Sequence, residues 1–148
     1  MPSTKQIPVT LVVIEDSDDD FETVIEAVKR SGVAADVRRA TTGEAGLAVL
    51  GEIAADRPVI VFLDLNTPGT DGREALAALK ADPGLKLIPV VVFSTSANPK
   101  DVGFCYAAGA NAYHVKPVQY PEHLQLVIDL VEYWFLRVTL STAGGPRS

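Results

Sequence analysis

Short apolar runs alternate with longer amphipathic stretches along most of the chain. Five segments predict β-strands, and they cover residues 9–14, 36–41, 58–64, 90–93 and 111–115. The third of them is apolar at every position from 59 to 63 and rich in β-branched residues, which is typical of a strand buried on both faces. The second is more polar and fits an edge strand better than a central one.

Helical patterns follow each of these runs, over residues 17–31, 42–53, 71–80, 98–109 and 121–140. Ser17 is a suitable cap for the first helix, and the three aspartates after it lie in the first turn, where the helix dipole favours acids. Strict alternation of strands and helices predicts an α/β fold. We expect a doubly wound five-stranded parallel sheet with five helices covering its two faces.

The pattern predicts one domain with short ends. Residues 1–8 are a polar lead-in, 9–140 form the domain with an extended last helix, and 141–148 form a flexible tail. The net charge of -6 gives no general attraction to nucleic acid. Cys105 is the single cysteine, and no signal peptide or membrane-spanning run is found. We therefore expect a cytoplasmic protein with neither nucleic acid nor membrane as a partner.

Polar side chains follow the ends of four predicted strands. Glu15 and Asp16 follow the first strand and Asp64 ends the third; Ser94 and Lys116 follow the last two. In open parallel sheets, ligands bind at the carboxyl ends of the strands. One edge of the sheet should therefore gather three acids, a hydroxyl and an amine.

These residue types suit phosphoryl chemistry with a bound cation. Clustered carboxylates repel one another, and oxygen ligands without His or Cys favour Mg²⁺ or Mn²⁺. We expect Glu15 and Asp16 to hold the metal and Asp64 to act as a nucleophile that forms an acyl phosphate. Ser94 and Lys116 would bind the phosphoryl oxygens. The next acids, Asp18–Asp20, are interpreted as helix-start acids and not as ligands.

Four segments together resemble the receiver domain of response regulators in two-component signalling. They are LVVIEDS at 11–17, LDLNTPGTDG at 63–72, PVVVFSTS at 89–96 and AYHVKP at 112–117. Each segment alone is a weak signal, but their order and spacing are specific, and the resemblance covers about residues 8–137. It implies a flavodoxin-like sheet with strand order 2-1-3-4-5.

The resemblance also implies roles for individual residues. Asp64 would accept a phosphoryl group from a phosphohistidine of a sensor histidine kinase, and the backbone carbonyl of Asn66 would complete the metal ligands. Tyr113 would be an aromatic residue that changes rotamer with Ser94, and the bond that corresponds to Lys116–Pro117 is often cis in this family. Thr67 and Thr95 depart from the family pattern at positions expected to affect rates, not the reaction itself.

A looser resemblance concerns a subgroup. EDS at 15–17, DLN at 64–66, the Ser-Thr-Ser run and EYWFL at 132–136 resemble stand-alone regulators that are paired with phytochrome-type kinases. This implies a bacteriophytochrome as the kinase, a light-sensing pathway and an output through protein contacts. A phosphate shuttle or sink in a phosphorelay is a variant of the same reading.

The last predicted helix is apolar on more than one side. Leu124, Val127, Ile128, Val131 and Trp134-Phe135 form one stripe that the sheet should bury. Leu126, Leu130, Tyr133 and Leu140 lie off that stripe, which favours a homodimer through this helix and its neighbours. The alternative is that they are scattered surface residues.

Two other functions fit parts of the pattern. A phosphatase of the haloacid-dehalogenase type also begins from a strand-end aspartate, but it needs a second aspartate two residues later, where this chain has Asn66. A flavodoxin-like nucleotide binder would need a glycine-rich loop after the first strand, where this chain has acids. We therefore expect a phosphoacceptor and not an enzyme with a separate substrate. His114 and Cys105 are interpreted as packing residues.

Overall fold

The computed structural model describes residues 8–66 and 72–142. Thr67, the first seven residues of the predicted lead-in and all but the first two residues of the predicted tail lie outside this part. Within it, the five strands are β1 (Val9–Ile14), β2 (Ala35–Ala40), β3 (Val59–Asp64), β4 (Val90–Ser94) and β5 (Ala112–Val115). All neighbouring strands are parallel, and their order is β2-β1-β3-β4-β5, which confirms the predicted flavodoxin-like topology.

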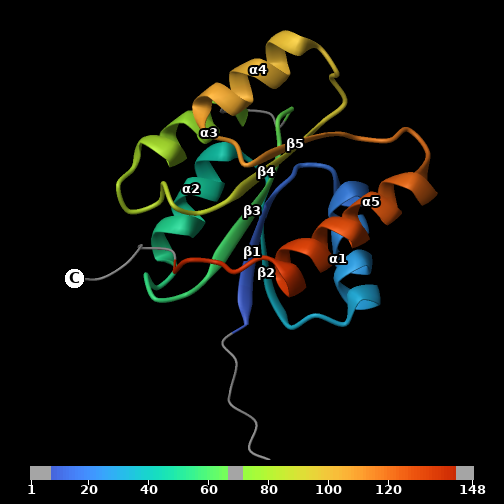
Figure 1. The fold of residues 1–148 in the computed structure, drawn as a ribbon, viewed down its shortest axis with the longest axis horizontal. Helices are drawn as coiled ribbons and strands as arrows, with labels where there is room; N and C mark the ends of the chain where they lie inside the picture. Colours follow the sequence, from blue (N-terminus) through green and yellow to red (C-terminus); the bar gives the residue numbers. More distant parts are fainter. Residues whose placement is uncertain (1–7, 67–71, 143–148) are drawn as a thin grey trace, which may run out of the picture.

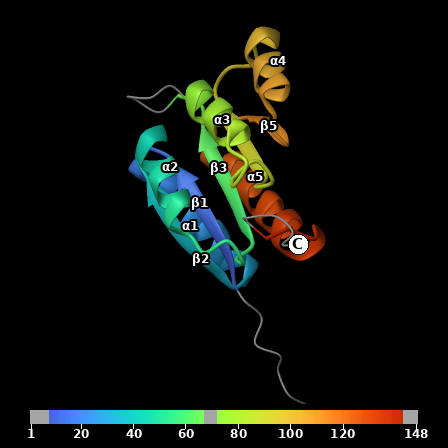
Figure 2. The same ribbon diagram turned by 90° about the vertical axis from the view of Figure 1, so that its left-hand side faces the viewer.

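The helices form two layers around the sheet (Figures 1 and 2). They are α1 (Asp18–Ser31), α2 (Gly43–Glu52), α3 (Gly72–Ala81), α4 (Pro99–Ala108) and α5 (Tyr120–Glu132). One buried cluster joins the sheet to α2, α3 and α4, and a second joins its other face to α1 and α5. Every residue of β3 is buried, Asp64 included, as expected for a central strand of a sheet covered on both faces.

The last helix differs from the prediction in its end. The α-helix ends at Glu132 and continues as a short π-helix over Tyr133–Arg137, instead of running to Leu140. The chain then crosses the base of the sheet, where Thr142 forms an isolated antiparallel bridge with Pro58 (Figure 1). Among the described helices, none combines the length and apolarity needed to cross a membrane.

Leu130 was wrongly predicted to lie off the buried stripe of the last helix. It is 9% exposed and belongs to the core between the sheet, α1 and α5, and Leu126 is partly buried against the same core. The stripe is wide because α5 packs against α1 as well as against the sheet. Of the residues assigned to a second apolar face, Tyr133 is exposed.

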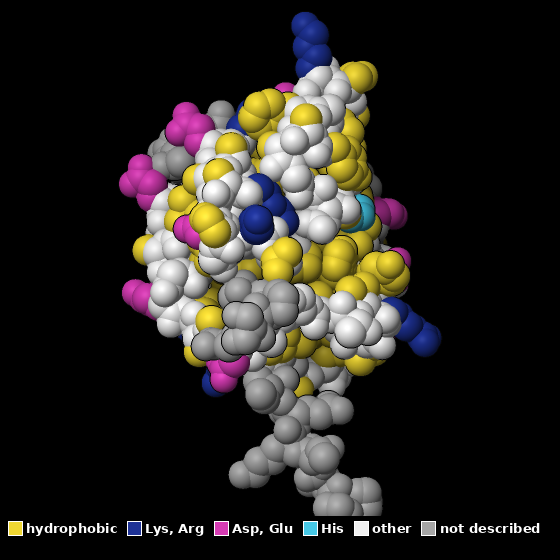
Figure 3. Space-filling model, turned by 60° about the vertical axis from the view of Figure 1, so that its left-hand side comes forward, with side chains coloured by type: hydrophobic (Ala, Val, Ile, Leu, Met, Phe, Trp, Pro, Cys, Tyr) yellow, Lys and Arg dark blue, Asp and Glu magenta, His cyan; other side chains and the backbone are white. Residues whose placement is uncertain are grey.

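Large apolar side chains do reach the surface elsewhere. Most of them lie on α4, at the end of β5, in the loop that follows it and at the beginning of α5: Phe104, Tyr106, Val115, Val118 and Tyr120. Figure 3 shows hydrophobic side chains gathered on the surface beside α4. We refer to these five residues below as the α4–β5 patch.

Candidate functional site

Strand ends bring the predicted residues to one edge of the sheet. Glu15 follows β1, Asp64 ends β3 and Ser94 ends β4, and all three are buried. The ladder between β3 and β4 pairs Asp64 with Phe93, so Ser94 lies one position beyond it on the adjacent strand. Lys116 follows β5, and its backbone N–H donates to the Ser94 carbonyl.

The ammonium group of Lys116 lies among three carboxylates. Its Nζ donates to Glu15 Oε1 at 3.1 Å, to Asp64 Oδ2 at 3.2 Å and to Asp20 Oδ2 at 2.6 Å. The lysine side chain is 10% exposed, so these ion pairs are well shielded from water. One buried cation thus offsets part of the charge of three acids.

Asp20 is a member of this cluster that the sequence analysis missed. Oxygen atoms of Glu15, Asp20 and Asp64 lie within 4.8 Å of one another. A signal was present in the sequence, because the buried residues of α1 are Thr23, Val24 and Ala27, and Asp20 precedes them by three, four and seven positions. The helical period that buries those residues also directs Asp20 toward the strand ends.

Asp16 is not brought into the same group. Its residue is exposed, and the contact found for it is made by its backbone carbonyl, which accepts from Arg39 Nη2 at 3.1 Å. Ser17 caps α1 as predicted, with its hydroxyl accepting from the Asp20 N–H at 3.2 Å. Asp18 and Asp19 are first-turn acids with exposed residues, which agrees with their predicted place at the helix start.

Crowding of charge changes the protonation of the cluster. Burial, followed by a hydrogen bond and the charge of Asp64, raises the pKa of Glu15 from 4.5 to about 8, although Lys116 lowers it in part. Burial alone would lower the pKa of Lys116, but its hydrogen bond with Asp20 and the charges of Glu15 and Asp64 raise it above the usual range. The amine is therefore a permanent cation, whereas Glu15 holds a proton near neutral pH.

Asp64 is fixed by a local turn. Its Oδ1 accepts from the backbone N–H of Asn66 at 3.0 Å, and its Oδ2 accepts from Lys116. α3 begins very close to this turn, since a Cβ added at Gly72 would lie 2.6 Å from the carbonyl oxygen of Leu65. Glycine is therefore required at the position where α3 meets the backbone that follows Asp64.

Ser94 and Tyr113 meet through one loop. The Ser94 hydroxyl accepts from the backbone N–H of Ser96 at 3.0 Å, and the Tyr113 hydroxyl donates to the Ser96 carbonyl at 2.8 Å. Thr95 lies between Ser94 and Ser96 in the sequence and is exposed. The loop after β4 thus connects a hydroxyl at the edge of the sheet with an aromatic side chain on β5.

A groove of about 760 Å³ is lined by two members of the cluster, Asp20 and Lys116, and opens to the surface. On one side α1 contributes acids, among them Asp19, Glu22 and Glu26, and on the other lie Val118 and Tyr120. A small cavity of about 20 Å³ touches Glu15, Asp20, Asp64 and Lys116 directly, which is room for one water molecule. Asp20 and Lys116 are therefore open to the groove, whereas Glu15 and Asp64 line only the small cavity.

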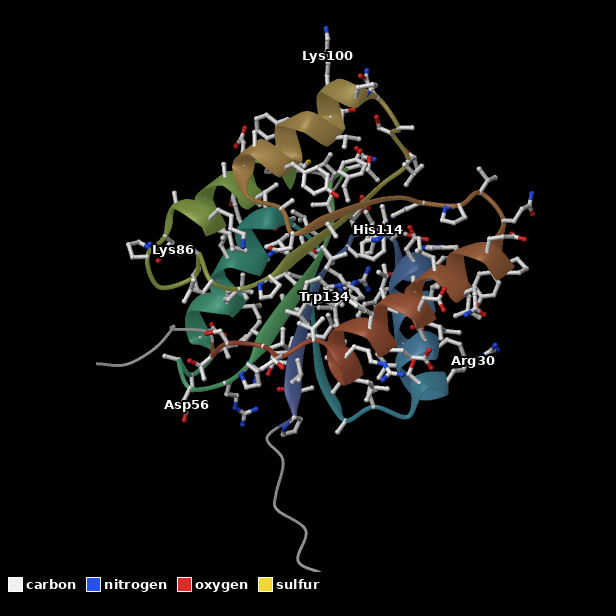
Figure 4. The ribbon with its side chains drawn as sticks, viewed as in Figure 1. Arg30, Asp56, Lys86, Lys100, His114 and Trp134 are labelled. Atoms are coloured by element: carbon white, nitrogen blue, oxygen red, sulfur yellow. The ribbon has the colours of Figure 1, made fainter. Side chains whose placement is uncertain are left out.

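The remaining candidates are packing residues, as predicted. Cys105 is fully buried in the core on the α2, α3 and α4 side. The His114 ring lies 5.8 Å from that of Phe93, and burial lowers the pKa of this histidine. Figure 4 shows His114 and Trp134 on the α5 side of the sheet. No cis peptide bond occurs among the described residues, so the cis Lys116–Pro117 bond implied by the resemblance is absent.

Donor chemistry of the cluster fits a divalent cation. Its ligand atoms are carboxylate oxygens, which Mg²⁺ and Mn²⁺ prefer, and they converge from β1, α1 and β3 on one small volume. Three carboxylates surround the single ammonium of Lys116, so negative charge is in excess there. A bound cation would relieve that excess.

Known proteins share both the sequence pattern and the fold. Residues 11–128 match the family described as the response regulator receiver domain. Response regulator Rcp1 of Synechocystis sp. is 37% identical over 140 residues, which cover 92% of this chain and 95% of that protein.

Two solved structures carry the comparison further. The phosphorylated cyanobacterial phytochrome response regulator RcpA is 37% identical, with a TM-score of 0.82 over 88% of this chain and 96% of that one. The Mn²⁺-bound form of Rcp1 is 34% identical, with a TM-score of 0.84 over 91% and 100% of the two chains. The protein described here belongs to the response regulator receiver family, and it is a phosphoacceptor of two-component signalling.

Proposed function

We propose that Asp64 is the residue that accepts the phosphoryl group, from a phosphohistidine of a sensor histidine kinase. The observation that carries this proposal is the position of its carboxylate at the end of a buried strand, with a lysine ammonium 3.2 Å away that also lines an open groove. In the transfer, the phosphorus–nitrogen bond of the donor breaks as a carboxylate oxygen of Asp64 forms the new phosphorus–oxygen bond. Lys116 supplies positive charge to the phosphoryl oxygens.

Glu15, Asp20 and Asp64 are proposed to hold Mg²⁺ or Mn²⁺, and Asp16 and the Asn66 carbonyl are proposed as further ligands. The cation would neutralise charge on the phosphoryl oxygens. Support for the three carboxylates comes from their convergence within 4.8 Å, and a relative has been solved with Mn²⁺ bound. Asp16 and Asn66 are both exposed, and each lies two residues beyond the end of a strand, β1 and β3, at the same edge of the sheet.

Ser94 and Tyr113 are proposed to report the modification. Ser94 is fully buried on the strand next to Asp64. Rotation of its side chain about one bond would turn the hydroxyl away from Ser96 and let it donate to another acceptor. Because Ser94 and Tyr113 both bind Ser96, a turn of the hydroxyl toward a phosphoryl group on Asp64 would loosen one of the contacts that hold this loop. The altered loop conformation would then change the position of Tyr113 and of the beginning of α4.

The kinase is proposed to be a bacteriophytochrome, in a light-sensing pathway in the cytoplasm. Support comes from the similarity to RcpA, which is described as a phytochrome response regulator. We propose that a histidine side chain of the kinase approaches through the groove that reaches Lys116. The α1 wall of this groove is acidic and its other wall is partly apolar. We propose no turnover of a separate substrate, since Asn66 stands where a phosphatase of the haloacid-dehalogenase type has its general acid.

A homodimer through the last helix and its neighbours remains part of the proposal, with the contact placed on the α4–β5 patch. This surface is supported because Val118 is 96% exposed and four more large apolar residues on α4, at the end of β5 and at the beginning of α5 are exposed as well. Leu130 cannot contribute, since it is buried in the core. The patch lies next to Tyr113, so phosphorylation could be coupled to association.

Acetyl phosphate with Mg²⁺ tests the central proposal without a kinase. Intact-mass spectrometry is expected to show one added phosphoryl group on the wild type and none on Asp64→Asn. Asp56→Asn is the matched control, because Asp56 is an exposed acid in the loop before β3, outside the groove, and this variant should be modified like the wild type. Undiminished labelling of Asp64→Asn would overturn the assignment.

A further inference from the structure

One arginine on the edge strand β2 contacts the loop between β1 and α1 at several points. Arg39 Nε donates to the carbonyl of Glu15 at 3.0 Å, and its Nη2 donates to the carbonyl of Asp16 at 3.1 Å. Its Nη1 lies 2.8 Å from Asp18 Oδ1, and the guanidinium stacks 4.9 Å from the ring centre of Phe21. All three nitrogens of the guanidinium are thus used on one short segment.

Register explains why this side chain can reach the loop. Arg39 pairs with Val13, two residues before Glu15, and the next residue, Ala40, accepts from the Glu15 N–H at 2.9 Å. The guanidinium therefore continues the contact between β2 and β1 beyond the last strand residue. Two carbonyls at the end of β1 that no longer have a strand partner receive donors in a fixed, planar arrangement.

The clamped segment carries acids of the proposed metal site at both ends. Glu15 begins it, and Asp20 follows in the first turn of α1, whose start is set by the Ser17 cap. Arg39 touches neither carboxylate group of the cluster; it holds the backbone from which they project. Fixing that backbone before a cation arrives avoids ordering the segment at the moment of binding.

We propose that Arg39 is a positioning residue that holds the β1–α1 segment in the conformation in which Glu15 and Asp20 converge on a divalent cation. The inference rests on the proposed cation site. A purely electrostatic role would act in the opposite direction, because a positive charge near the acids weakens cation binding. Removing Arg39 should therefore weaken Mg²⁺ binding if the residue positions the segment, and strengthen it if the residue acts only through its charge.

Isothermal titration of the metal-free protein with Mg²⁺ at fixed pH tests the inference. Arg39→Gln and Arg39→Lys are both expected to bind Mg²⁺ more weakly. Their dissociation constants should be about tenfold higher or more, as for other residues that orient metal ligands. Lysine keeps the charge but cannot span both carbonyls. Arg38→Gln is the matched control, since Arg38 lies on the same strand and pairs with Asp36 instead; it should bind Mg²⁺ like the wild type.

Hydrogen exchange of the metal-free variants gives a second readout. Faster exchange confined to the amides of residues 15–20 is expected for Arg39→Lys, whereas general destabilisation would raise exchange throughout the sheet. Unchanged Mg²⁺ affinity in both Arg39 variants, or tighter binding in Arg39→Gln, would overturn the inference. If the wild type itself binds no Mg²⁺, the proposed cation site is wrong. If the wild type binds Mg²⁺ and both Arg39 variants bind it equally well, only the positioning role of Arg39 is wrong.

Discussion

The free energy of unfolding of the metal-free protein should fall as the pH rises through neutrality, because Glu15 loses its proton. Burial and then Asp64 raise the pKa of Glu15 from 4.5 to about 8. Between these values the folded state holds a proton that the unfolded chain releases. The stabilisation due to this proton is therefore complete below the unfolded pKa and is lost as the pH rises through the folded pKa. At about 1.4 kcal/mol per pKa unit, the loss between pH 6 and pH 8 is about 2 kcal/mol.

Urea unfolding in EDTA at a series of pH values measures this loss, with the fluorescence of Trp134 as the signal. Trp134 is partly buried against the core shared by α1 and α5, so unfolding changes its surroundings. Glu15→Gln mimics the protonated carboxyl at every pH. Between pH 6 and pH 8 the free energy of unfolding should fall by about 2 kcal/mol more in the wild type than in this variant.

Two comparisons make the test specific. Glu22→Gln removes an exposed acid from α1 and should follow the pH dependence of the wild type. Mg²⁺ added at pH 8 should restore stability to the wild type, because cation binding favours the folded state with Glu15 ionised. Parallel pH curves for the wild type and Glu15→Gln would refute the reasoning, since they would show that Glu15 does not retain its proton on folding.

Three further changes have defined expected outcomes. Lys116→Met leaves three carboxylates without their buried counter-charge and should lower the free energy of unfolding in EDTA by about 3–5 kcal/mol in urea titrations, with partial recovery in Mg²⁺. Gly72→Ala places a Cβ 2.6 Å from a backbone carbonyl and should cost about 1–3 kcal/mol in the same titrations, whereas Gly51→Ala, with open space around its Cβ, should stabilise α2 slightly. Phe104→Lys and Val118→Lys should each reduce the mass measured by light scattering if the α4–β5 patch forms the dimer; an unchanged dimer mass would exclude this surface.

Most of the fold could be predicted because it depends on patterns that are local. Alternating buried runs and amphipathic helices, with Ser17 and Gly32 at the two ends of α1, set the order of elements. The strand ends then placed Glu15, Asp64, Ser94 and Lys116 at one edge of the sheet. These residues were found in the sequence because the carboxyl ends of parallel strands share that edge.

Features that depend on packing between elements were missed, or left only an ambiguous signal in the sequence. Asp20 belongs to the acidic cluster because α1 turns that side of the helix toward Lys116, while the same residue also has the sequence signature of an ordinary first-turn acid. Leu130 is buried because α5 contacts α1 as well as the sheet. The π-helix after Glu132 and the chain crossing to Pro58 reflect contacts between distant segments.

Chemical trapping of the phosphorylated residue tests the central claim most directly. Protein treated with acetyl phosphate and Mg²⁺ is reduced with borohydride, which converts an aspartyl phosphate to homoserine, and is then digested and sequenced by mass spectrometry. The proposed function predicts conversion at position 64 alone, with none when EDTA replaces Mg²⁺. Conversion at Asp16 or Asp20 with Asp64 unmodified, or stable labelling without any conversion, would contradict the claim that Asp64 accepts the phosphoryl group.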